Sequence, residues 1–346
     1  MKNQLETFSK LTNNKQKNMM FSPVSFNTVL AILSEVTVGD TKEKIKEYLE
    51  REYSALFKEF FNIYKNDDNN VFAFSNGLWI NEKYTPGDKV KFVQDLYNMN
   101  IFKTDFKDAE HLASDINSYV DEKTFHMIPK IVESKDVKGS DSVFVNAVYF
   151  QSAWKDSLFR RKDLFLDFEG NKKETDFVYG KADAYMENDS AIAFSKNYEN
   201  NIQFIGILPK KENFEVQDLN IEELLNSKSY KYDVSIGMPV LNFETEMELS
   251  SLLPALGLED LLTGRNMTEL YEDKTAFRIS RLIQNTKIEL DENGTKASAA
   301  TAAVVLRNCA FMLKERKEVI LNKPFFFFIY DEHHEEILFI GKVVSV

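Results

Sequence analysis

The length and charge of the chain exclude several classes of protein. It has 346 residues, of which 43% are apolar, enough to cover a large core and to exclude a mainly disordered chain. Its 43 basic and 55 acidic side chains leave a formal net charge of −12, the wrong sign for binding a nucleic-acid backbone or an anionic membrane surface. No apolar run approaches the roughly 18 residues of a membrane span. We therefore expect neither nucleic acid nor membrane as a partner.

The start of the chain and its cysteine content indicate a reducing compartment. Residues 1–10 lack the apolar centre of a secretory signal. Cys309 is the single cysteine, so no internal disulfide can form. We expect a cytoplasmic protein, with secretion by an unconventional route or after signal removal as the alternative.

Helical patterns dominate the first part of the sequence. The pair Ser22-Pro23 is a typical helix start, and the apolar face that follows over 23–48 predicts a buried helix. Thr41 is placed to cap a surface helix. Further elements are expected as surface helices over 41–49 and 54–64, a strand over 71–80, and helices over 90–99 and 109–123.

Strands dominate the rest. Residues 143–151 are almost all apolar and β-prone, which predicts a central strand covered on both faces. Later strands are expected over 202–208, 232–243, 278–290, 324–330 and 337–344, with one helix near 247–256. Helices followed by strands indicate an α+β fold. Because Gly (12) and Pro (7) are scarce and no linker is evident, we expect one domain over residues 1–346.

Enzyme signatures are missing from the sequence. It contains no phosphate-binding glycine loop, no Cys-x-x-Cys pair and no His-Glu-x-x-His motif. His333-His334 lies between acidic residues at an expected hairpin tip, and we interpret it as a solvated turn rather than a metal site. Nothing around Cys309 resembles a protease motif. We predict a protein that is not an enzyme and needs no metal or cofactor.

The segment from Glu292 to Val305 is unusual because most of its side chains are small. It could form a helix over 297–303 capped by Asn293 or Thr295, since alanine favours helices. Such a helix would bury little area. Small residues also suit a segment that enters an existing sheet, where a large side chain would displace packed core. With Gly294 as a hinge, the segment is interpreted as a spare strand.

This segment and several other blocks resemble the serpin family. Residues 292–303 resemble the hinge of inhibitory serpins, and similar matches occur over 18–25, 144–154, 322–325 and 338–344. The resemblance implies a serpin fold of three β-sheets with about eight or nine helices and an exposed reactive-centre loop over about 292–318. It also implies a serine-type endopeptidase inhibitor that acts as a suicide substrate by inserting its cleaved loop into the main sheet, forming a covalent complex with the target endopeptidase; a cross-class inhibitor of a cysteine endopeptidase is an alternative. We expect it to be a monomer.

The resemblance also implies functional positions. The hinge residues are Glu292, Gly294, Thr295, Ala297, Ser298, Ala299, Ala300 and Thr301. The sheet-opening region comprises Ser22, Ser25, Asn146, Trp154 and Gln284. Four positions depart from the usual pattern: Gln284 stands for histidine, His126 and Val36 for glycine, and Lys296 for glutamate. We expect Gln284 to rearrange the hydrogen bonds around Asn146.

The residue that precedes the scissile bond determines which class of protease can be the target. The family's usual count from Glu292 places it after Asn308, with Cys309 on the leaving side. Asn308 would point to an asparaginyl endopeptidase, a cysteine enzyme. The alternatives are Arg307, which would suit a trypsin-like serine protease, and Phe311, which would suit a chymotrypsin-like enzyme.

A rival function on the same fold is a serpin that no longer inhibits and serves as a chaperone, carrier or storage protein. Loss of inhibition is expected to leave bulky or charged residues over 295–303, and only Lys296 is charged there.

Two small basic clusters, 160–162 and 314–317, are interpreted as solvated rather than glycosaminoglycan-binding. Residues 293–295 form a glycosylation pattern in the hinge itself, which favours a chain that never meets the glycosylation machinery.

Overall fold

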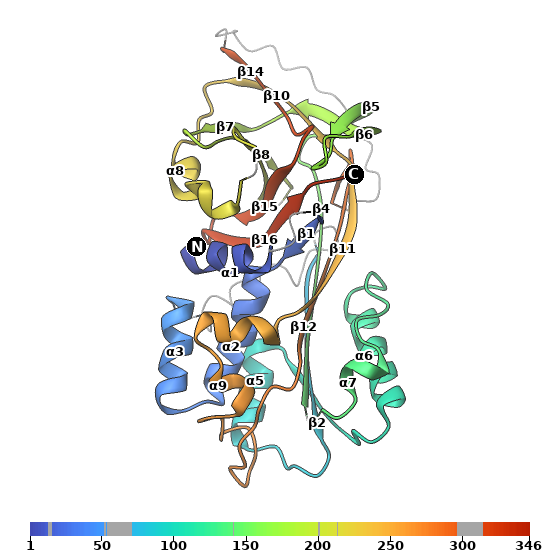
Figure 1. Ribbon diagram of the computed structural model, residues 1–346, viewed down its shortest axis with the longest axis vertical. Coiled ribbons are helices and arrows are strands. Elements are labelled where there is room, and N and C mark those ends of the chain that lie inside the picture. Colours follow the sequence, from blue (N-terminus) through green and yellow to red (C-terminus); the bar gives the residue numbers. More distant parts are fainter. Residues whose placement is uncertain are drawn as a thin grey trace.

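Three β-sheets form the frame of the structure. The computed structural model describes residues 1–12, 16–51, 53, 71–140, 142–199, 201–212, 214–295 and 314–346. One long sheet follows the vertical axis in Figure 1, with helices on both of its faces, and the two other sheets lie toward the upper end. The predicted α+β fold with three sheets is confirmed.

The long sheet, called here the main sheet, combines strands that are distant in sequence. Its order is β11 (Leu241–Glu248), β12 (Leu282–Leu290), β13 (Gly294–Thr295), β4 (Ser142–Ala153), β2 (Val71–Asn81) and β3 (Asn100–Thr104). β12 and β4 also pair directly with each other in parallel. As predicted from its apolar run, β4 is central and almost entirely buried.

Two further sheets complete the frame. The second sheet has the order β1 (Met19–Phe21), β16 (Glu336–Val343), β15 (Phe325–Asp331), β9 (Ile202–Pro209), β8 (Ala191–Asn197) and β7 (Ala184–Glu187). The third sheet has the order β14 (Arg316–Ile320), β10 (Asp233–Pro239), β6 (Lys172–Lys181) and β5 (Phe159–Leu166). The third sheet lies at the upper end of the molecule in Figure 1.

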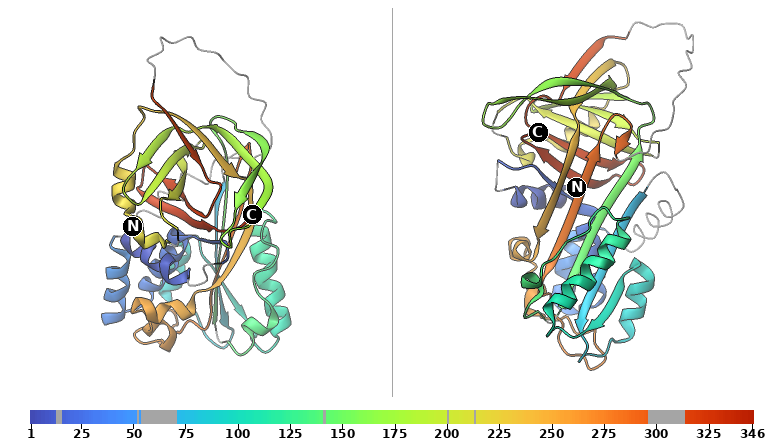
Figure 2. Two further views of the ribbon diagram at one scale, coloured as in Figure 1. Left: turned by 45° about the horizontal axis from the view of Figure 1, so that its top comes forward. Right: turned by 90° about the vertical axis from the view of Figure 1, so that its right-hand side faces the viewer.

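Helices cover both faces of the main sheet. The helices of the described residues are α1 (Lys2–Leu11), α2 (Pro23–Glu35), α3 (Gly39–Leu49), α5 (Asp88–Tyr97), α6 (Ala109–Lys123), α7 (Ser134–Val137), α8 (Ile221–Asn226) and α9 (Asp260–Thr263), with 3-10 helices η1 (Val216–Asp218) and η2 (Ser250–Leu256). Of these, α8 contacts β7 and β8 of the second sheet. Figure 2 shows α6 lying along one face, with α2 on the other. No helix of the described residues is long and apolar enough to cross a bilayer.

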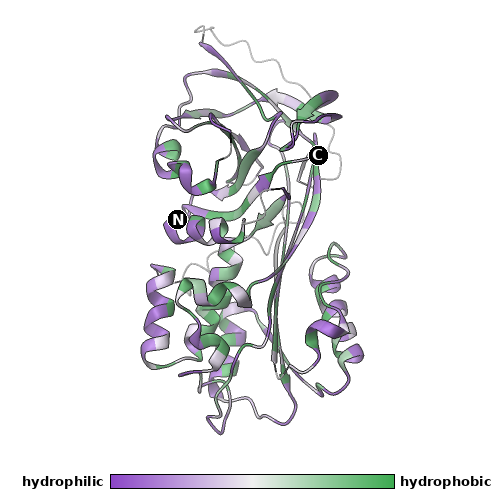
Figure 3. Cartoon of the chain, in the orientation of Figure 1, coloured by the Kyte–Doolittle hydropathy of each residue, from purple (hydrophilic) through white to green (hydrophobic). Residues whose placement is uncertain are grey.

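Helix α2 lies at the centre of the core. Ser22 caps it by accepting a hydrogen bond from the Ser25 N–H, and Pro23 occupies its first turn, as the Ser-Pro pair predicts. Every residue from Pro23 to Ser34 is buried. Figure 3 shows this helix as hydrophobic, whereas α3 carries hydrophilic residues on its outer side. A helix buried on all sides has no need of a polar face.

The predicted buried helix over 23–48 is wrong in extent, because the chain turns between α2 and α3. The Thr37 hydroxyl donates to the Leu33 carbonyl oxygen, which replaces a helix hydrogen bond, and Gly39 at φ +64° starts α3 in a new direction. Thr41 is not the cap of α3, since Val38 occupies the N-cap position. The predicted helix over 54–64 lies outside the described residues.

Three later predictions also need correction. The expected strand 232–243 is two strands, because the chain passes at Val240 from β10 in the third sheet to β11 in the main sheet. The helix expected near 247–256 is instead a 3-10 helix over Ser250–Leu256, which contains Pro254. The strand expected to begin at Arg278 begins at Leu282. Strands β5 to β8 and β14 were not predicted, since several of them are rich in charged residues.

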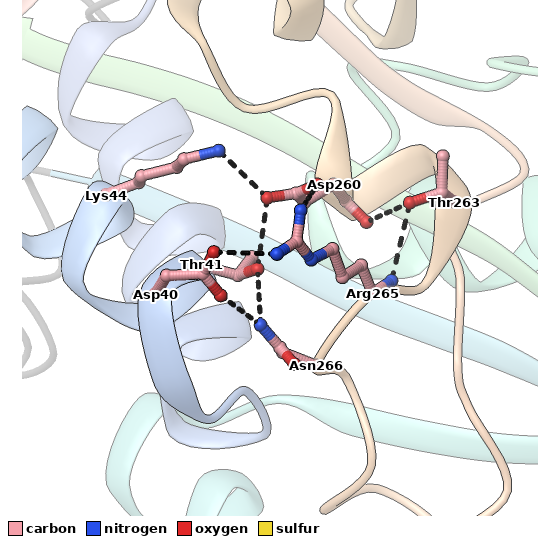
Figure 4. Close-up of polar contacts among 7 residues, drawn as sticks. All are labelled: Asp40, Thr41, Lys44, Asp260, Thr263, Arg265 and Asn266. Atoms are coloured by element: carbon pink, nitrogen blue, oxygen red, sulfur yellow. Dashed lines mark hydrogen bonds and ion pairs between the residues drawn. The ribbon is translucent and has the colours of Figure 1, made fainter.

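A buried carboxylate joins α3 to α9 (Figure 4). Asp260, only 6% exposed, accepts hydrogen bonds from the Thr41 hydroxyl at 3.1 Å and the Lys44 ammonium at 3.0 Å. Asn266 donates to Thr41 at 3.2 Å, and Arg265 binds Asp40 at 3.0 Å. The hydrogen bond from Lys44 is the main cause that lowers the pKa of Asp260. We call this set of residues the α3–α9 clamp.

We predict that Asp260→Asn lowers the free energy of unfolding by about 1–2 kcal/mol at pH 7, because it removes the charge that Lys44 and Thr41 share. A lowered folded-state pKa stabilises the fold above the ordinary aspartate pKa of about 3.9, and this contribution is lost as pH falls through the folded value. Urea unfolding of the wild type and of Asp260→Asn at pH 7 and at pH 3 measures this contribution to the free energy of unfolding.

The difference in the free energy of unfolding between the wild type and Asp260→Asn should be smaller at pH 3 than at pH 7. Glu43→Gln is a matched control, because Glu43 is exposed on the same helix and its partner among the described residues is Lys46 of that helix. A difference for Asp260→Asn that stays constant with pH, or equals that of Glu43→Gln, would contradict the ionic role.

Candidate functional site

The hinge predicted from sequence enters the main sheet as a short strand. Thr295 of β13 pairs with Leu290 of β12 on one side and with Ser152 of β4 on the other. β12 and β4 pair directly from Leu282–Phe144 to Lys287–Tyr149. At one end of the main sheet, β12 and β4 are thus separated by the two residues of β13. Over the rest of their shared length they pair directly with each other.

Gly294 is the point at which the chain turns into the sheet. Its φ of +147° is rare for residues with a side chain, and a Cβ built on it would lie 2.2 Å from the Ser152 carbonyl oxygen and 2.7 Å from the Ala153 Cα. No side chain fits so close to the backbone of a neighbouring strand. The hinge glycine inferred from the sequence is therefore required by geometry.

Thr295 is held by an aromatic pair beneath it. Its side chain is 2% exposed, and its hydroxyl lies 2.7 Å from the hydroxyl of buried Tyr198. Tyr198 stacks on Trp154 with ring centroids 4.3 Å apart, and the Trp154 indole N–H donates to the Asp291 carbonyl oxygen at 2.9 Å. Burial raises the pKa of Tyr198, so its hydroxyl stays protonated. Trp154 and Tyr198 together form the floor of the hinge.

Glu292, the first hinge residue, is bound to the third sheet. The Arg160 guanidinium donates to its carboxylate with N–O distances of 2.6 and 2.8 Å, and the Glu292 carbonyl oxygen accepts from the Leu158 N–H at 3.0 Å. This hydrogen bond to Glu292 is the main cause that raises the pKa of Arg160. Residues 160–162 are exposed, as interpreted from the sequence, and the structure adds that Arg160 is paired with Glu292, 132 residues away in sequence.

A polar cluster lies under the closed part of the sheet. The Gln284 side chain, 0% exposed, accepts from the Ser22 N–H at 3.0 Å and donates to the Ser22 carbonyl oxygen at 3.1 Å and to Asn146 Oδ1 at 3.3 Å. Ser25 also donates to Asn146 Oδ1, and Asn146 donates to Asn76 at 2.7 Å. Gln284 and Asn146 are register partners on β12 and β4. We call these residues the opening cluster; it connects both strands to α2.

The structure therefore brings together two groups of predicted residues: Glu292, Gly294, Thr295 and Trp154 at the hinge, and Ser22, Ser25, Asn146 and Gln284 in the opening cluster. The other predicted hinge residues, Lys296, Ala297, Ser298, Ala299, Ala300 and Thr301, lie outside the described residues, as do Arg307, Asn308, Cys309 and Phe311. Tyr198 and Arg160 were missed as hinge partners. No local pattern marks them, since only the fold places them beside the hinge.

The His333-His334 pair lies in the hairpin turn between β15 and β16, as predicted, and His333 is exposed there. The His334 side chain, in contrast, is 6% exposed, and its Nδ1 lies 2.7 Å from a carboxylate oxygen of buried Asp331. Within the residues that the structure describes, no three His, Cys, Asp or Glu side chains are grouped so that they could hold a metal.

His126, which stands for a glycine, has a positive φ of 62°, the conformation that glycine adopts freely.

Comparison with known proteins agrees with this geometry. The family model described as serpin (serine protease inhibitor) matches residues 4–346. The chain belongs to the serpin family. A serpin-like protein of Methanosarcina acetivorans is 27% identical over 364 residues, covering 97% of this chain and 83% of that protein. Plasma serine protease inhibitor of Bos taurus is 26% identical over 351 residues, covering 94% of this chain and 85% of that protein.

Solved serpin structures share the fold over nearly the whole length. The thermophilic serpin tengpin in its native state superposes with a TM-score of 0.86 at 27% identity, covering 99% of this chain and 92% of that chain. Arabidopsis AtSerpin1 in its native stressed conformation superposes with a TM-score of 0.85 at 22% identity, covering 99% and 96%. The resemblance found in the sequence is confirmed at the level of family and fold.

We predict that the Tyr198–Thr295 hydrogen bond holds the hinge in the sheet. Tyr198→Phe keeps the stack on Trp154 and removes only the hydroxyl, which should weaken hinge insertion by about 1 kcal/mol and speed hydrogen exchange of the hinge amides roughly fivefold. Thr295→Val removes the other partner at nearly constant volume. In a double-mutant cycle followed by hydrogen exchange, the double variant should differ little from either single variant.

Tyr185→Phe is the matched control, because the Tyr185 hydroxyl binds Glu187 away from the hinge. Strictly additive effects of Tyr198→Phe and Thr295→Val, or an equal effect of Tyr185→Phe, would contradict this role.

Proposed function

We propose that this serpin is an inhibitor that acts as a suicide substrate. A protease cleaves the loop after β13 and forms an acyl-enzyme, and the freed segment then inserts between β12 and β4 before the ester or thioester is hydrolysed. The observation that carries the proposal is the position of Gly294–Thr295, already paired as a strand between these two strands. The small residues over 297–303 follow in sequence after Lys296.

The energy for such a step would come from completing the sheet. About a dozen new backbone pairs, each contributing a net of about 1 kcal/mol, give on the order of 10 kcal/mol, which compares with the stability of a whole domain. Insertion must first separate β12 from β4, and this requires breaking the hydrogen bonds between Gln284 and Asn146. The opening cluster is the barrier that we expect to keep the uncleaved molecule closed.

The target depends on the scissile residue. We propose a serine endopeptidase as the target class and Asn308, with Cys309 on the leaving side, as the reactive bond; because Asn308 would also suit an asparaginyl endopeptidase, a cross-class inhibitor of a cysteine enzyme is the alternative. Arg307 and Phe311 remain the alternatives for trypsin-like and chymotrypsin-like serine proteases. The serpin family model carries the description serine protease inhibitor, which supports the serine protease alternatives.

A non-inhibitory role is the rival proposal. Thyroxine-binding globulin, in a structure with bound thyroxine, shares the fold with a TM-score of 0.80 at 20% identity, covering 99% of this chain and 96% of that chain. The fold alone therefore does not select inhibition. The small residues over 297–303 favour the inhibitor, because bulky or charged side chains there would oppose insertion into the main sheet.

The hinge geometry also supports a location away from the glycosylation machinery. Asn293 of the acceptor pattern lies directly before Gly294, and its carbonyl oxygen accepts from the Trp154 N–H at 2.9 Å. A glycan at this residue would stand where the segment enters the sheet. We propose a cytoplasmic monomer whose partner is the target endopeptidase.

The test is Thr295→Arg against proteases of the three classes named above. Thr295 is only 2% exposed, so the substitution would bury an unpaired guanidinium charge at a cost of several kcal/mol. Insertion of the loop should then become slower than hydrolysis of the acyl-enzyme. We expect the wild type to form a complex that survives boiling in detergent, and the variant to be cleaved without trapping. Mass spectrometry of the new terminus identifies the scissile residue.

Thr295→Ser is the control, because it keeps a small hydroxyl side chain and should still inhibit. Stable complexes of Thr295→Arg at wild-type stoichiometry would contradict insertion. Cleavage of the wild type by every enzyme without any stable complex would favour the non-inhibitory rival.

A further inference from the structure

The dipeptide Asn-Gly occurs twice in the chain, as Asn76-Gly77 in β2 and as Asn293-Gly294 at the hinge. In this dipeptide the asparagine side chain is open to attack by the next backbone nitrogen, because glycine has no side chain to shield that nitrogen. Both glycines are required by packing, since a Cβ built on either one would lie 2.5 Å or less from an atom of a neighbouring residue. The two sites therefore share one chemical reactivity in different surroundings.

Asn76 is fixed by burial in the middle of the main sheet. It is 1% exposed, its Oδ1 accepts a hydrogen bond from the Asn146 amide at 2.7 Å, and its carbonyl oxygen accepts from the Tyr119 hydroxyl at 3.1 Å. Gly77 pairs with β4 on one side and with β3 on the other. Attack by the Gly77 nitrogen would require breaking these contacts, so this site can react only when the whole sheet opens.

Asn293 lies at the end of the main sheet, in the turn between β12 and β13, and is half-buried. Its N–H donates to Asp291 Oδ1 at 2.8 Å, and its carbonyl oxygen accepts from the Trp154 N–H at 2.9 Å. The strand that follows, β13, has only two residues, and its Thr295 hydroxyl lies 2.7 Å from that of Tyr198. Release of β13 would free the backbone around Asn293 without opening the rest of the sheet, and such local opening costs far less than global unfolding.

We propose that Asn293 is a site of spontaneous deamidation, which reacts when β13 leaves the main sheet. The Gly294 nitrogen forms a bond to the side-chain carbonyl carbon of Asn293, the bond from that carbon to Nδ2 breaks, and ammonia leaves with the proton of the Gly294 N–H. Water then opens the cyclic imide at one of its two carbonyl carbons, which gives aspartate or isoaspartate. Water is the only other reactant. This inference does not depend on inhibition.

Conversion to isoaspartate should prevent the hinge from returning to the sheet. The main chain before Gly294 becomes longer by a methylene group, and the carbonyl group that accepts from the Trp154 N–H becomes part of a free carboxylate. Gly294 has no room for such a shift, because the backbone of β4 lies against it. Either product also adds a negative charge beside Asp291 and Glu292, which already share Arg160.

Peptide mapping of the full chain by mass spectrometry, after incubation in mildly alkaline buffer, tests the site with Asn76 as an internal control. In the folded protein we expect Asn293 to convert at least tenfold faster than Asn76, whereas in urea the two should convert at similar rates. Tyr198→Phe should speed conversion of Asn293 roughly fivefold by releasing β13, and should leave Asn76 unchanged. Tyr185→Phe should change neither rate.

Thr295→Val removes the same hydrogen bond from its other partner, which keeps the test valid if Tyr198→Phe fails to fold. Equal conversion of Asn76 and Asn293 in the folded protein would overturn the proposal. A rate at Asn293 that is unaffected by both substitutions, or that is as fast in the folded protein as in urea, would also overturn it, because release of β13 would then not control the reaction.

The consequence for the hinge is tested on the isoaspartate form after its separation by ion exchange. Hydrogen exchange at the Thr295 amide should be at least tenfold faster in this form than in the unconverted protein, because β13 no longer pairs with β4 and β12. Asn293→Gln should not yield this form, since the longer side chain closes the ring far more slowly. Equal protection of Thr295 in both forms would contradict the loss of hinge pairing.

Discussion

The direct pairing of β12 with β4 is the constraint on which the rest of the structure depends. From Leu282–Phe144 to Lys287–Tyr149 the two strands share backbone hydrogen bonds, so no other strand can lie between them there. The chain that follows β12 turns at Gly294, enters for two residues and reaches Ser152, three residues from the closed part of the sheet. The main sheet is thus built with one strand position occupied only at its end.

Polar contacts control the two ends of this arrangement. Under the closed part, Gln284 connects α2 with both strands, and its hydrogen bonds must break before the strands can separate. At the hinge, Tyr198 binds Thr295 and Arg160 binds Glu292, so entry of the segment is fixed from the second and third sheets. Buried hydrogen bonds of this kind select one geometry and oppose partial opening. Closure and hinge position are therefore separate interactions that can be altered independently.

Much of this organisation can be predicted from the sequence, for identifiable reasons. The apolar run of β4, the Ser22-Pro23 helix start and the small residues after Gly294 are local patterns, and the structure places β4, α2 and the start of the hinge where they indicate. Partners that only the tertiary fold supplies were missed: Tyr198 and Arg160 are far from the hinge in sequence, and the charged strand β5 lacks apolar alternation. The hairpin turn that holds His333-His334 was predicted, but the burial of the His334 side chain beside Asp331 was not, because it arises from the folded hairpin.

The claim that the cleaved loop inserts into the main sheet as a further strand is tested most directly by the melting temperature. It is measured before and after a single cut in the loop, within residues 304–311. If the freed segment inserts between β12 and β4, the gain on the order of 10 kcal/mol should raise the melting temperature by roughly 10 °C or more. The two fragments should stay associated, since the inserted strand would join the core. An unchanged or lower melting temperature after the cut would contradict insertion, and with it the proposed inhibitory mechanism.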